Sequence, residues 1–159
     1  MTKKNFLYLM ALCVMIISSC DPGRLFEENK IIEGNAWYYK NYIPFDLQVK
    51  DTTKFYNVYL NLRVSADYKY SNIFVWFHAT NPLKKIDQRR VEIKLADEHG
   101  RWLGSGLGDI YDYQFPVLQK VKFPQSGFYR FELEQNMRDD TLMNVKSVGV
   151  RVEEFEVNK

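Results

Sequence analysis

Alternation of apolar and polar side chains is the main pattern along this chain, and it is clearest between residues 56 and 64. Every second residue from Tyr56 to Val64 is apolar, while Asn57, Asn61 and Arg63 lie between them. Successive side chains of a β-strand point to opposite faces of the sheet. The spacing therefore predicts a strand with one face in a core and the other face in water.

The segment from Asn72 to Ala79 has a different pattern, because the residues from Ile73 to Phe77 are apolar without interruption. Such a run predicts either a central strand covered on both sides or a strand whose outer face binds a partner. Asn81-Pro82 follows and predicts its end.

Shorter runs with a period of two recur along the rest of the chain. We predict further strands at residues 25–32, 43–49, 91–95, 117–123, 129–133 and 148–152, with a hairpin around Trp102. No segment has a sustained apolar stripe at the helical spacing of about 3.6 residues. About eight or nine short strands joined by turns predict an all-β fold. One wet face per strand favours an antiparallel two-sheet β-sandwich, jelly-roll-like, over a closed barrel.

The first twenty residues are organised differently. Lys3 and Lys4 precede an uncharged apolar run, residues 6–17, which is shorter than the roughly 20 residues of a membrane-spanning helix. This pattern is typical of an export signal that is removed. Its end, Ile17-Ser18-Ser19-Cys20, resembles the lipobox of bacterial lipoproteins, which implies cleavage before Cys20 and acylation of that residue. The alternative is an ordinary secretory signal with an incidental cysteine.

Three parts follow from these patterns: a signal peptide at residues 1–19, a lipidated cysteine with a short tether at 20–24, and one β-sandwich domain at 25–159. A mature chain of about 140 residues is long enough for one core. Cys13 lies in the signal and Cys20 would carry lipid, so we expect no disulfide within the domain.

The charge balance gives no support to two kinds of partner. Loss of the signal removes two lysines and no acid, which leaves equal numbers of basic and acidic residues. Overall composition therefore gives no argument for nucleic acid or for a polybasic membrane-binding segment.

Catalysis has little support in the sequence. His78 lies in an apolar strand and His99 in a turn, and neither accompanies a nucleophile motif. Glycines at 104, 106 and 108 lack the helix that follows a phosphate loop, so they indicate a bulge or a close strand approach. We expect no catalytic residue, no metal site and no cofactor.

Charged residues between the strands allow further interpretations. The acids Asp109, Asp112, Asp139 and Asp140 could form a glycosidase pair or a calcium site, but solvated turns are the simpler interpretation. The basic run of residues 84–90 is also interpreted as a solvated turn.

Five stretches outside the signal are distinctive as a set. They are Tyr68-Lys69-Tyr70-Ser71-Asn72 with the strand after it, residues 95–106 around Trp102-Leu103-Gly104, Phe123-Pro124 with Gly127-Phe128-Tyr129, Glu134-Gln135-Asn136-Met137-Arg138, and Val145 to Glu153. Together with the lipobox they resemble the gliding-motility lipoprotein family GldH of the Bacteroidetes over nearly the whole mature chain. The segments around Trp102 and Arg138 are the most specific, whereas Asp87-Gln88-Arg89-Arg90 departs from the family pattern.

The resemblance implies a non-enzymatic lipoprotein of the cell envelope that serves gliding motility or the type IX protein secretion machinery linked to it. We expect a lipid anchor in the membrane, at the outer membrane or periplasmic face, and other envelope proteins as partners. Trp102, Arg138 and Trp76 are the candidate partner-binding residues. Alternatively, Trp102 fills the core, and Arg138 is buried as a fork, with its guanidinium donating hydrogen bonds to turn carbonyls or to a carboxylate.

Two other functions stay open. Aromatic residues exceed what one core face needs, and jelly-roll domains often stack such rings on sugars, so a glycan-binding lipoprotein that uses Trp76 or Trp102 is the main alternative. A glycan hydrolase that uses the acidic turns is the weaker one.

Overall fold

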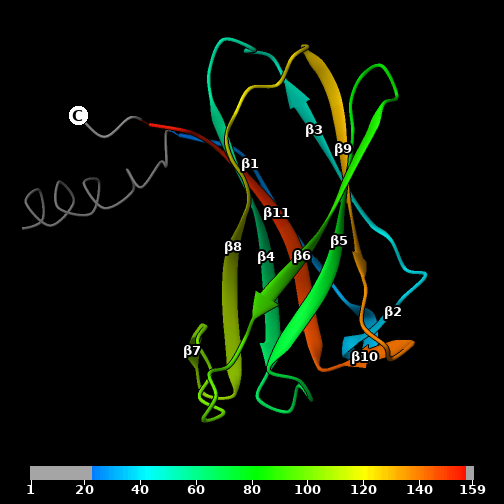
Figure 1. Cartoon of the computed structure of the whole chain (residues 1–159), viewed down its shortest axis with the longest axis vertical. Coiled ribbons are helices and arrows are strands. Elements are labelled where there is room, and N and C mark those ends of the chain that lie inside the picture. The colour runs from blue at the N-terminus through cyan, green and yellow to red at the C-terminus, as the bar shows by residue number, and fades with distance from the viewer. Residues whose placement is uncertain (1–22, 157–159) are drawn as a thin grey trace, which may run out of the picture.

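Two antiparallel sheets face each other in the computed structural model of the chain, which describes residues 23–156 (Figure 1). The strands are β1 Arg24–Ile31, β2 Ala36–Tyr38, β3 Ile43–Val49, β4 Tyr56–Ser65, β5 Asn72–Thr80, β6 Ile86–Lys94, β7 Ser105–Leu107, β8 Ile110–Val121, β9 Gly127–Gln135, β10 Thr141–Met143 and β11 Val145–Glu154, with the 3₁₀ helix η2 at Glu33–Asn35. The predicted signal peptide and Cys20 lie outside the described residues.

The strand order is that of a jelly roll. One sheet has the order β1-β11-β4-β8-β7 and the other β3-β9-β5-β6, while β10 and β2 form a separate short pair. The chain crosses repeatedly between the two sheets, as it does in a double Greek key. The prediction of an all-β, antiparallel, jelly-roll-like sandwich is confirmed.

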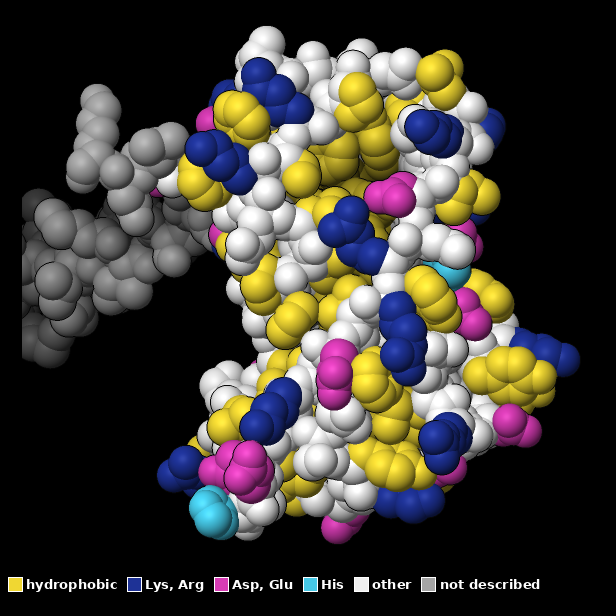
Figure 2. Space-filling model, in the orientation of Figure 1, with side chains coloured by type: hydrophobic (Ala, Val, Ile, Leu, Met, Phe, Trp, Pro, Cys, Tyr) yellow, Lys and Arg dark blue, Asp and Glu magenta, His cyan; other side chains and the backbone are white. Residues whose placement is uncertain are grey.

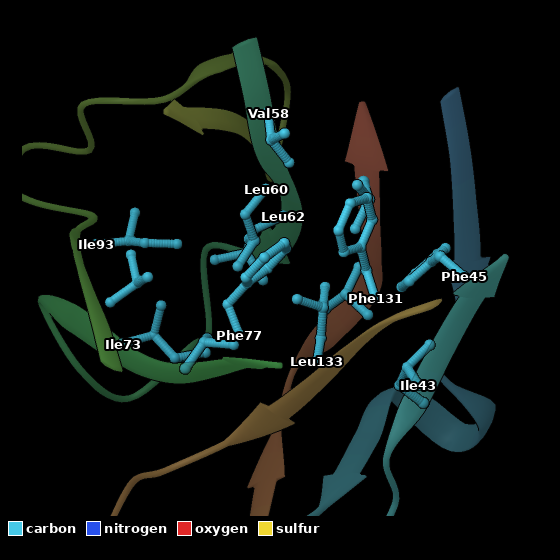
Figure 3. Packing of buried hydrophobic residues seen from close by; sticks show 14 of the residues in the cluster. Ile43, Phe45, Val58, Leu60, Leu62, Ile73, Phe77, Ile93, Phe131 and Leu133 are labelled. Carbon is cyan, nitrogen blue, oxygen red and sulfur yellow. The ribbon is translucent and has the colours of Figure 1, made fainter. Parts of the chain in front are cut away.

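The core lies between the sheets and follows the period of two. Alternate residues of β4, from Tyr56 to Val64, are all buried. In the opposite sheet Phe77 of β5 and Phe131 of β9 contact each other, with ring centroids 5.1 Å apart. Figure 3 shows the side chains of these strands filling the space between the sheets. Aromatic and branched side chains thus supply the burial that holds the domain together.

Strand β5 is buried on one face only. Its inner residues Ile73, Val75 and Phe77 are at most 1% exposed, whereas Phe74 and Trp76 on the outer face are half-buried. Within residues 23–156 no further layer covers that outer face. The expectation of a strand covered on both sides is therefore wrong, and the second expectation, an outer face available to a partner, stays a prediction.

The basic run predicted as a turn is partly a strand. Lys84 and Lys85 lie in the turn after β5, but β6 begins at Ile86 and pairs with β5 through Arg89 and Arg90. Residues 86–90 are exposed on both faces, so no alternation marks them in the sequence. Backbone pairing with β5, not burial, makes this segment a strand.

Three short strands, β2, β7 and β10, were not predicted, and β8 begins at Ile110 instead of residue 117. The prediction for the glycines before β8 is confirmed. A side chain at Gly106 would place its Cβ 2.3 Å from the carbonyl oxygen of Ile110, so only glycine allows β7 to pair so closely with β8.

Candidate functional site

Trp76 lies at the centre of the uncovered outer face of the four-stranded sheet. In the β-sheet register it is opposite Arg90 of β6 and Glu134 of β9. His78 follows on the same face, with its ring centroid 6.3 Å from that of Trp76. The indole is thus bordered by a cation, an anion and an imidazole.

His78 joins Trp76 to the edge of the sheet. Its Nε2 lies 3.0 Å from Oε2 of Glu134, and both side chains are mostly buried. The ring of Tyr42, just before β3, lies 5.9 Å from the imidazole. The carboxylate of Glu134 raises the pKa of the Tyr42 hydroxyl, because a nearby negative charge disfavours the phenolate.

Arg90 and Phe74 complete this surface at its other end. The guanidinium Cζ of Arg90 lies 3.8 Å from the centroid of the Phe74 ring, and Arg90 Nε donates to Oδ1 of Asn136 at 2.7 Å. We call Tyr42, Phe74, Trp76, His78, Arg90 and Glu134 the outer aromatic cluster. Aromatic rings with an arginine are the side chains enriched in protein interfaces.

Arg138 lies in the loop between β9 and β10 and is exposed. The interpretation of Arg138 as a buried fork is wrong, because Gln135 has that role. Gln135 is 1% exposed; its Nε2 donates to the carbonyl oxygens of Asp139 and Asp140 at 3.0 and 3.3 Å, and its Oε1 accepts the N–H of Met137 at 2.9 Å. This amide holds the loop that presents Arg138.

Asp139 ties the same loop to the segment before β5. Its Oδ2 accepts hydrogen bonds from the hydroxyl of Tyr70 at 2.6 Å and from Nζ of Lys69 at 3.2 Å. These two donors, Tyr70 first, lower the pKa of Asp139. The loop is therefore fixed on one side by Gln135 and on the other by Tyr70.

Trp102 fills space at the end of the sandwich. It pairs with Ala96 in an isolated bridge, and its ring stacks on Tyr111 with centroids 5.2 Å apart. It is half-buried and packs against the core. Asp97 shapes the intervening turn, because its Oδ1 accepts the N–H groups of His99 and Arg101, and these bonds, that of Arg101 first, lower the pKa of Asp97.

The structure brings the three candidate residues to one region without joining them in one site. Phe74, two residues before Trp76, accepts the N–H of Asn136 and donates its own to Sδ of Met137, so Arg138 borders the outer aromatic cluster. Trp102 belongs to a separate hairpin. That hairpin is connected to the segment before β5, because the N–H groups of Leu95 and Ala96 donate to the carbonyl of Ser71. Both loops lie at the end of the sandwich farthest from Gly23 (Figure 1).

The acidic residues weighed for a glycosidase or calcium site are dispersed. Asp112 forms a bidentate pair with Arg63, with distances of 2.6 and 3.1 Å, while Asp139 is bound by Lys69 and Tyr70. Among residues 23–156 no three His, Cys, Asp or Glu side chains are placed to hold a metal ion. Nor does that part of the chain contain a helix of the length and apolarity that crosses a membrane.

Most members of the outer aromatic cluster escaped sequence reasoning. Tyr42, Phe74 and Glu134 come from three different segments, and only the register of β9, β5 and β6 brings them together. The apolar run of β5 is the one signal in the sequence, because it places Phe74 and Trp76 two residues apart on the outer face.

Comparison with known proteins supplies the family. The sequence model of the family described as GldH lipoprotein matches residues 24–152 of this chain. The chain is 31% identical over 155 residues to the gliding motility lipoprotein GldH of Flavobacterium johnsoniae, covering 92% of this chain and 94% of that protein. It is 30% identical over 153 residues to a gliding motility lipoprotein GldH homolog of Christiangramia forsetii, covering 92% and 93%.

Proposed function

Because the chain belongs to the GldH lipoprotein family, we propose that it is a lipid-anchored, non-enzymatic accessory protein of gliding motility or of the type IX secretion machinery linked to it. The names of both relatives support a role in gliding motility. The single structural observation that carries the accessory role is the outer aromatic cluster, an uncovered sheet face with the composition of a protein interface.

The anchor in this proposal is lipid on Cys20. The lipobox-like end of the signal supports it, as does the position of β1, which begins only four residues later at Arg24. Cys20→Ala should move the protein from the membrane fraction to the soluble fraction, and mass spectrometry of the wild type should find an acylated N-terminal cysteine. Cys13→Ala, which lies in the predicted signal, is the matched control and should keep the anchor.

The partner in this proposal is another protein of the envelope, at the outer membrane or its periplasmic face. Trp76 would insert at the centre of the contact, and Arg138 would add a charged contact at its border, since its guanidinium is exposed. Trp102 would act indirectly, by packing on Tyr111 and supporting the end of the sandwich.

Copurification from solubilised membranes tests the contact. Trp76→Ala and Arg138→Ala should each lower partner recovery and impair gliding or secretion while the melting temperature changes little. Phe128→Ala is the matched control, because Phe128 is a 68% exposed aromatic residue on the same sheet outside the cluster. Unchanged recovery in both variants would reject this contact surface.

Glycan binding is the second candidate, and one feature favours it. A polar hollow of about 280 Å³ lies on the outer face of the five-stranded sheet. Asn29, Asn61 and Gln114 form a row across this face, with Gly149 between the first two. Amide side chains both donate and accept hydrogen bonds, as sugar hydroxyls require.

A glycan array separates the two candidates. If the hollow binds sugar, Asn61→Ala should abolish binding, because Asn61 hydrogen-bonds both Asn29 and Gln114. If stacking on the indole binds sugar, Trp76→Ala should abolish it instead. Absence of saturable binding to cell-wall and dietary polysaccharides would reject this candidate.

A further inference from the structure

Four segments meet at the end of the sandwich where the described chain begins. The carbonyl of Gly23, before β1, accepts the N–H of Glu154, and the carbonyl of Phe55, before β4, accepts the N–H of Phe155. The end of β8 lies beside them, because Lys120 N donates to Oδ1 of Asn57. Both ends of the described chain thus lie on one side of the domain (Figure 1).

Lysine side chains cover phenylalanine rings at this end. Nζ of Lys120 lies 5.7 Å from the ring centroid of Phe55 and 5.4 Å from that of Phe155, and Nζ of Lys122 lies 4.7 Å from Phe55. Leu25 is exposed beside the same terminus. We call these five residues the lysine–phenylalanine patch. Figure 2 shows hydrophobic and basic side chains gathered at this edge.

The backbone of β8 is shaped to place Lys120 there. The pairing of β4 with β8 shifts register twice near Val58, as it does at β-bulges, which turn side chains in new directions. Lys120 itself has a φ of 50°, a left-handed conformation that is costly for a residue with a Cβ. The hydrogen bond from its N–H to Asn57 holds this conformation.

The two lysines of the patch carry unneutralised charge. Among residues 23–156 neither Lys120 nor Lys122 takes part in an ion pair, whereas nearby Lys54 pairs with Glu154 at 2.7 Å. The other acids at this end are Asp51, which accepts hydrogen bonds from Thr53, Glu153, which pairs with Arg151 at 2.8 Å, and exposed Glu156. Equal overall charge conceals this local surplus, because the patch draws on segments far apart in sequence.

Covalent geometry limits how far this end can lie from the anchor. Only Asp21 and Pro22 separate Cys20 from Gly23, and three residues span at most about 11 Å in any conformation. If Cys20 carries lipid, the adjoining end of the sandwich lies within reach of the membrane surface. Exposed rings with flanking lysines are the side chains that favour the interface of an anionic bilayer.

We propose that the lysine–phenylalanine patch docks on anionic phospholipid headgroups and holds the domain upright on its membrane. The lysines bind the phosphates, while Phe55, Phe155 and Leu25 rest among the headgroups. This proposal rests on the lipid anchor of the proposed function. It adds an orientation that the anchor alone does not impose.

Lysine acylation tests the proposal on the full-length lipidated protein. The protein is reconstituted in vesicles of phosphatidylcholine alone, or of phosphatidylcholine with about one third phosphatidylglycerol, and treated with a water-soluble acylating reagent. Lys120 and Lys122 should react on the order of tenfold more slowly in the anionic vesicles, since each lysine is attracted to the anionic surface. Lys94, which is exposed at the end of β6 opposite Asn72, should react equally in both.

A paired variant controls for charge. In the wild type, Lys50 on the adjoining loop should react more slowly in the anionic vesicles than in the neutral ones. The Lys120→Glu/Lys122→Glu protein should lose this difference at Lys50. The Lys84→Glu/Lys85→Glu protein should keep it. Flotation with neutral vesicles tests the anchor separately. If the protein floats but Lys120 and Lys122 react equally in the two lipids, docking is wrong and the anchor stands. If the protein does not float, the anchor itself is wrong.

Discussion

Replacement of Gln135 by leucine should loosen the loop that carries Arg138. Leucine has a similar volume, so the core stays filled, but it removes two hydrogen bonds to the carbonyls of Asp139 and Asp140 and one from the N–H of Met137. Because Gln135 is 1% exposed, water cannot readily replace the side chain. These backbone groups would lose their partner inside the protein.

The expected cost follows from the number of hydrogen bonds. Each polar group left without a partner in a buried position costs about 1 kcal/mol or more, and the added apolar burial offsets part of the sum. We expect a loss of about 2–3 kcal/mol in the free energy of unfolding, or roughly 10 °C in melting temperature for a domain of this size.

Urea unfolding followed by circular dichroism measures this cost. Gln48→Leu is the matched control, because Gln48 is exposed on β3, and it should change the free energy of unfolding by less than about 0.5 kcal/mol. Partner recovery should fall in Gln135→Leu as it does in Arg138→Ala, since the loop is no longer held. A loss of under about 1 kcal/mol for Gln135→Leu would refute the role given to this amide.

Three further outcomes can be checked on the purified protein. Trp102→Ala should lower the free energy of unfolding by about 2–3 kcal/mol, because it removes the stack on Tyr111; a change below about 1 kcal/mol would place the ring outside the core. Tyr70→Phe should raise the pKa of Asp139 toward its ordinary value, measured by NMR titration, since the hydroxyl is the main cause of its depression. The stabilisation linked to Asp139 is present above its unfolded pKa and is lost as the pH falls through the folded pKa. In Tyr70→Phe the two pKa values lie closer together, so the free energy of unfolding should fall by less on acidification than it does in the wild type. Gly149→Ala should cost about 2–4 kcal/mol in urea unfolding, because its Cβ would lie 2.6 Å from a carbonyl oxygen of β1.

Burial on one face is what made strands visible in the sequence. The bounds of strand β4 were predicted to within one residue. Its inner side chains are buried and its outer ones face water, so apolar and polar residues alternate along its sequence. The first half of β6 has no such contrast, since residues 86–90 are all exposed. Its pairing with β5 depends on backbone hydrogen bonds, which leave no pattern in side-chain chemistry.

The candidate site depended on register, which the sequence does not encode locally. Trp76 could be singled out from the apolar run of β5, but its neighbours Arg90 and Glu134 belong to strands chosen by the fold. Sheet order and crossovers must be known before such residues can be placed on one face. Single residues were therefore predictable as candidates, whereas the cluster was not.

The exchange of roles between Arg138 and Gln135 has a chemical reason. A turn that offers two carbonyl oxygens and one N–H needs a side chain that both donates and accepts hydrogen bonds. A guanidinium has five donors and no acceptor, so it cannot bind the N–H of Met137, and burial would leave its charge uncompensated. The neutral amide of Gln135 satisfies all three groups, which leaves the charge of Arg138 for the surface.

The two proposed contacts lie apart on the domain, and this separation bears on how the protein would work. The lysine–phenylalanine patch lies at the end beside Gly23, whereas the partner contact extends from Trp76, in the middle of β5, to the loop of Arg138. Strand β4 has ten residues and spans the sandwich, so at about 3.3 Å per residue its ends lie roughly 30 Å apart. With a tether of a few residues and the lysine–phenylalanine patch docked on the lipid, the domain has little freedom to tilt. The loop of Arg138 and the adjoining outer aromatic cluster would then be held at a fixed height above the lipid. A partner in the same membrane would meet this surface at one height and in one orientation, which lowers the entropy cost of binding without any further contact.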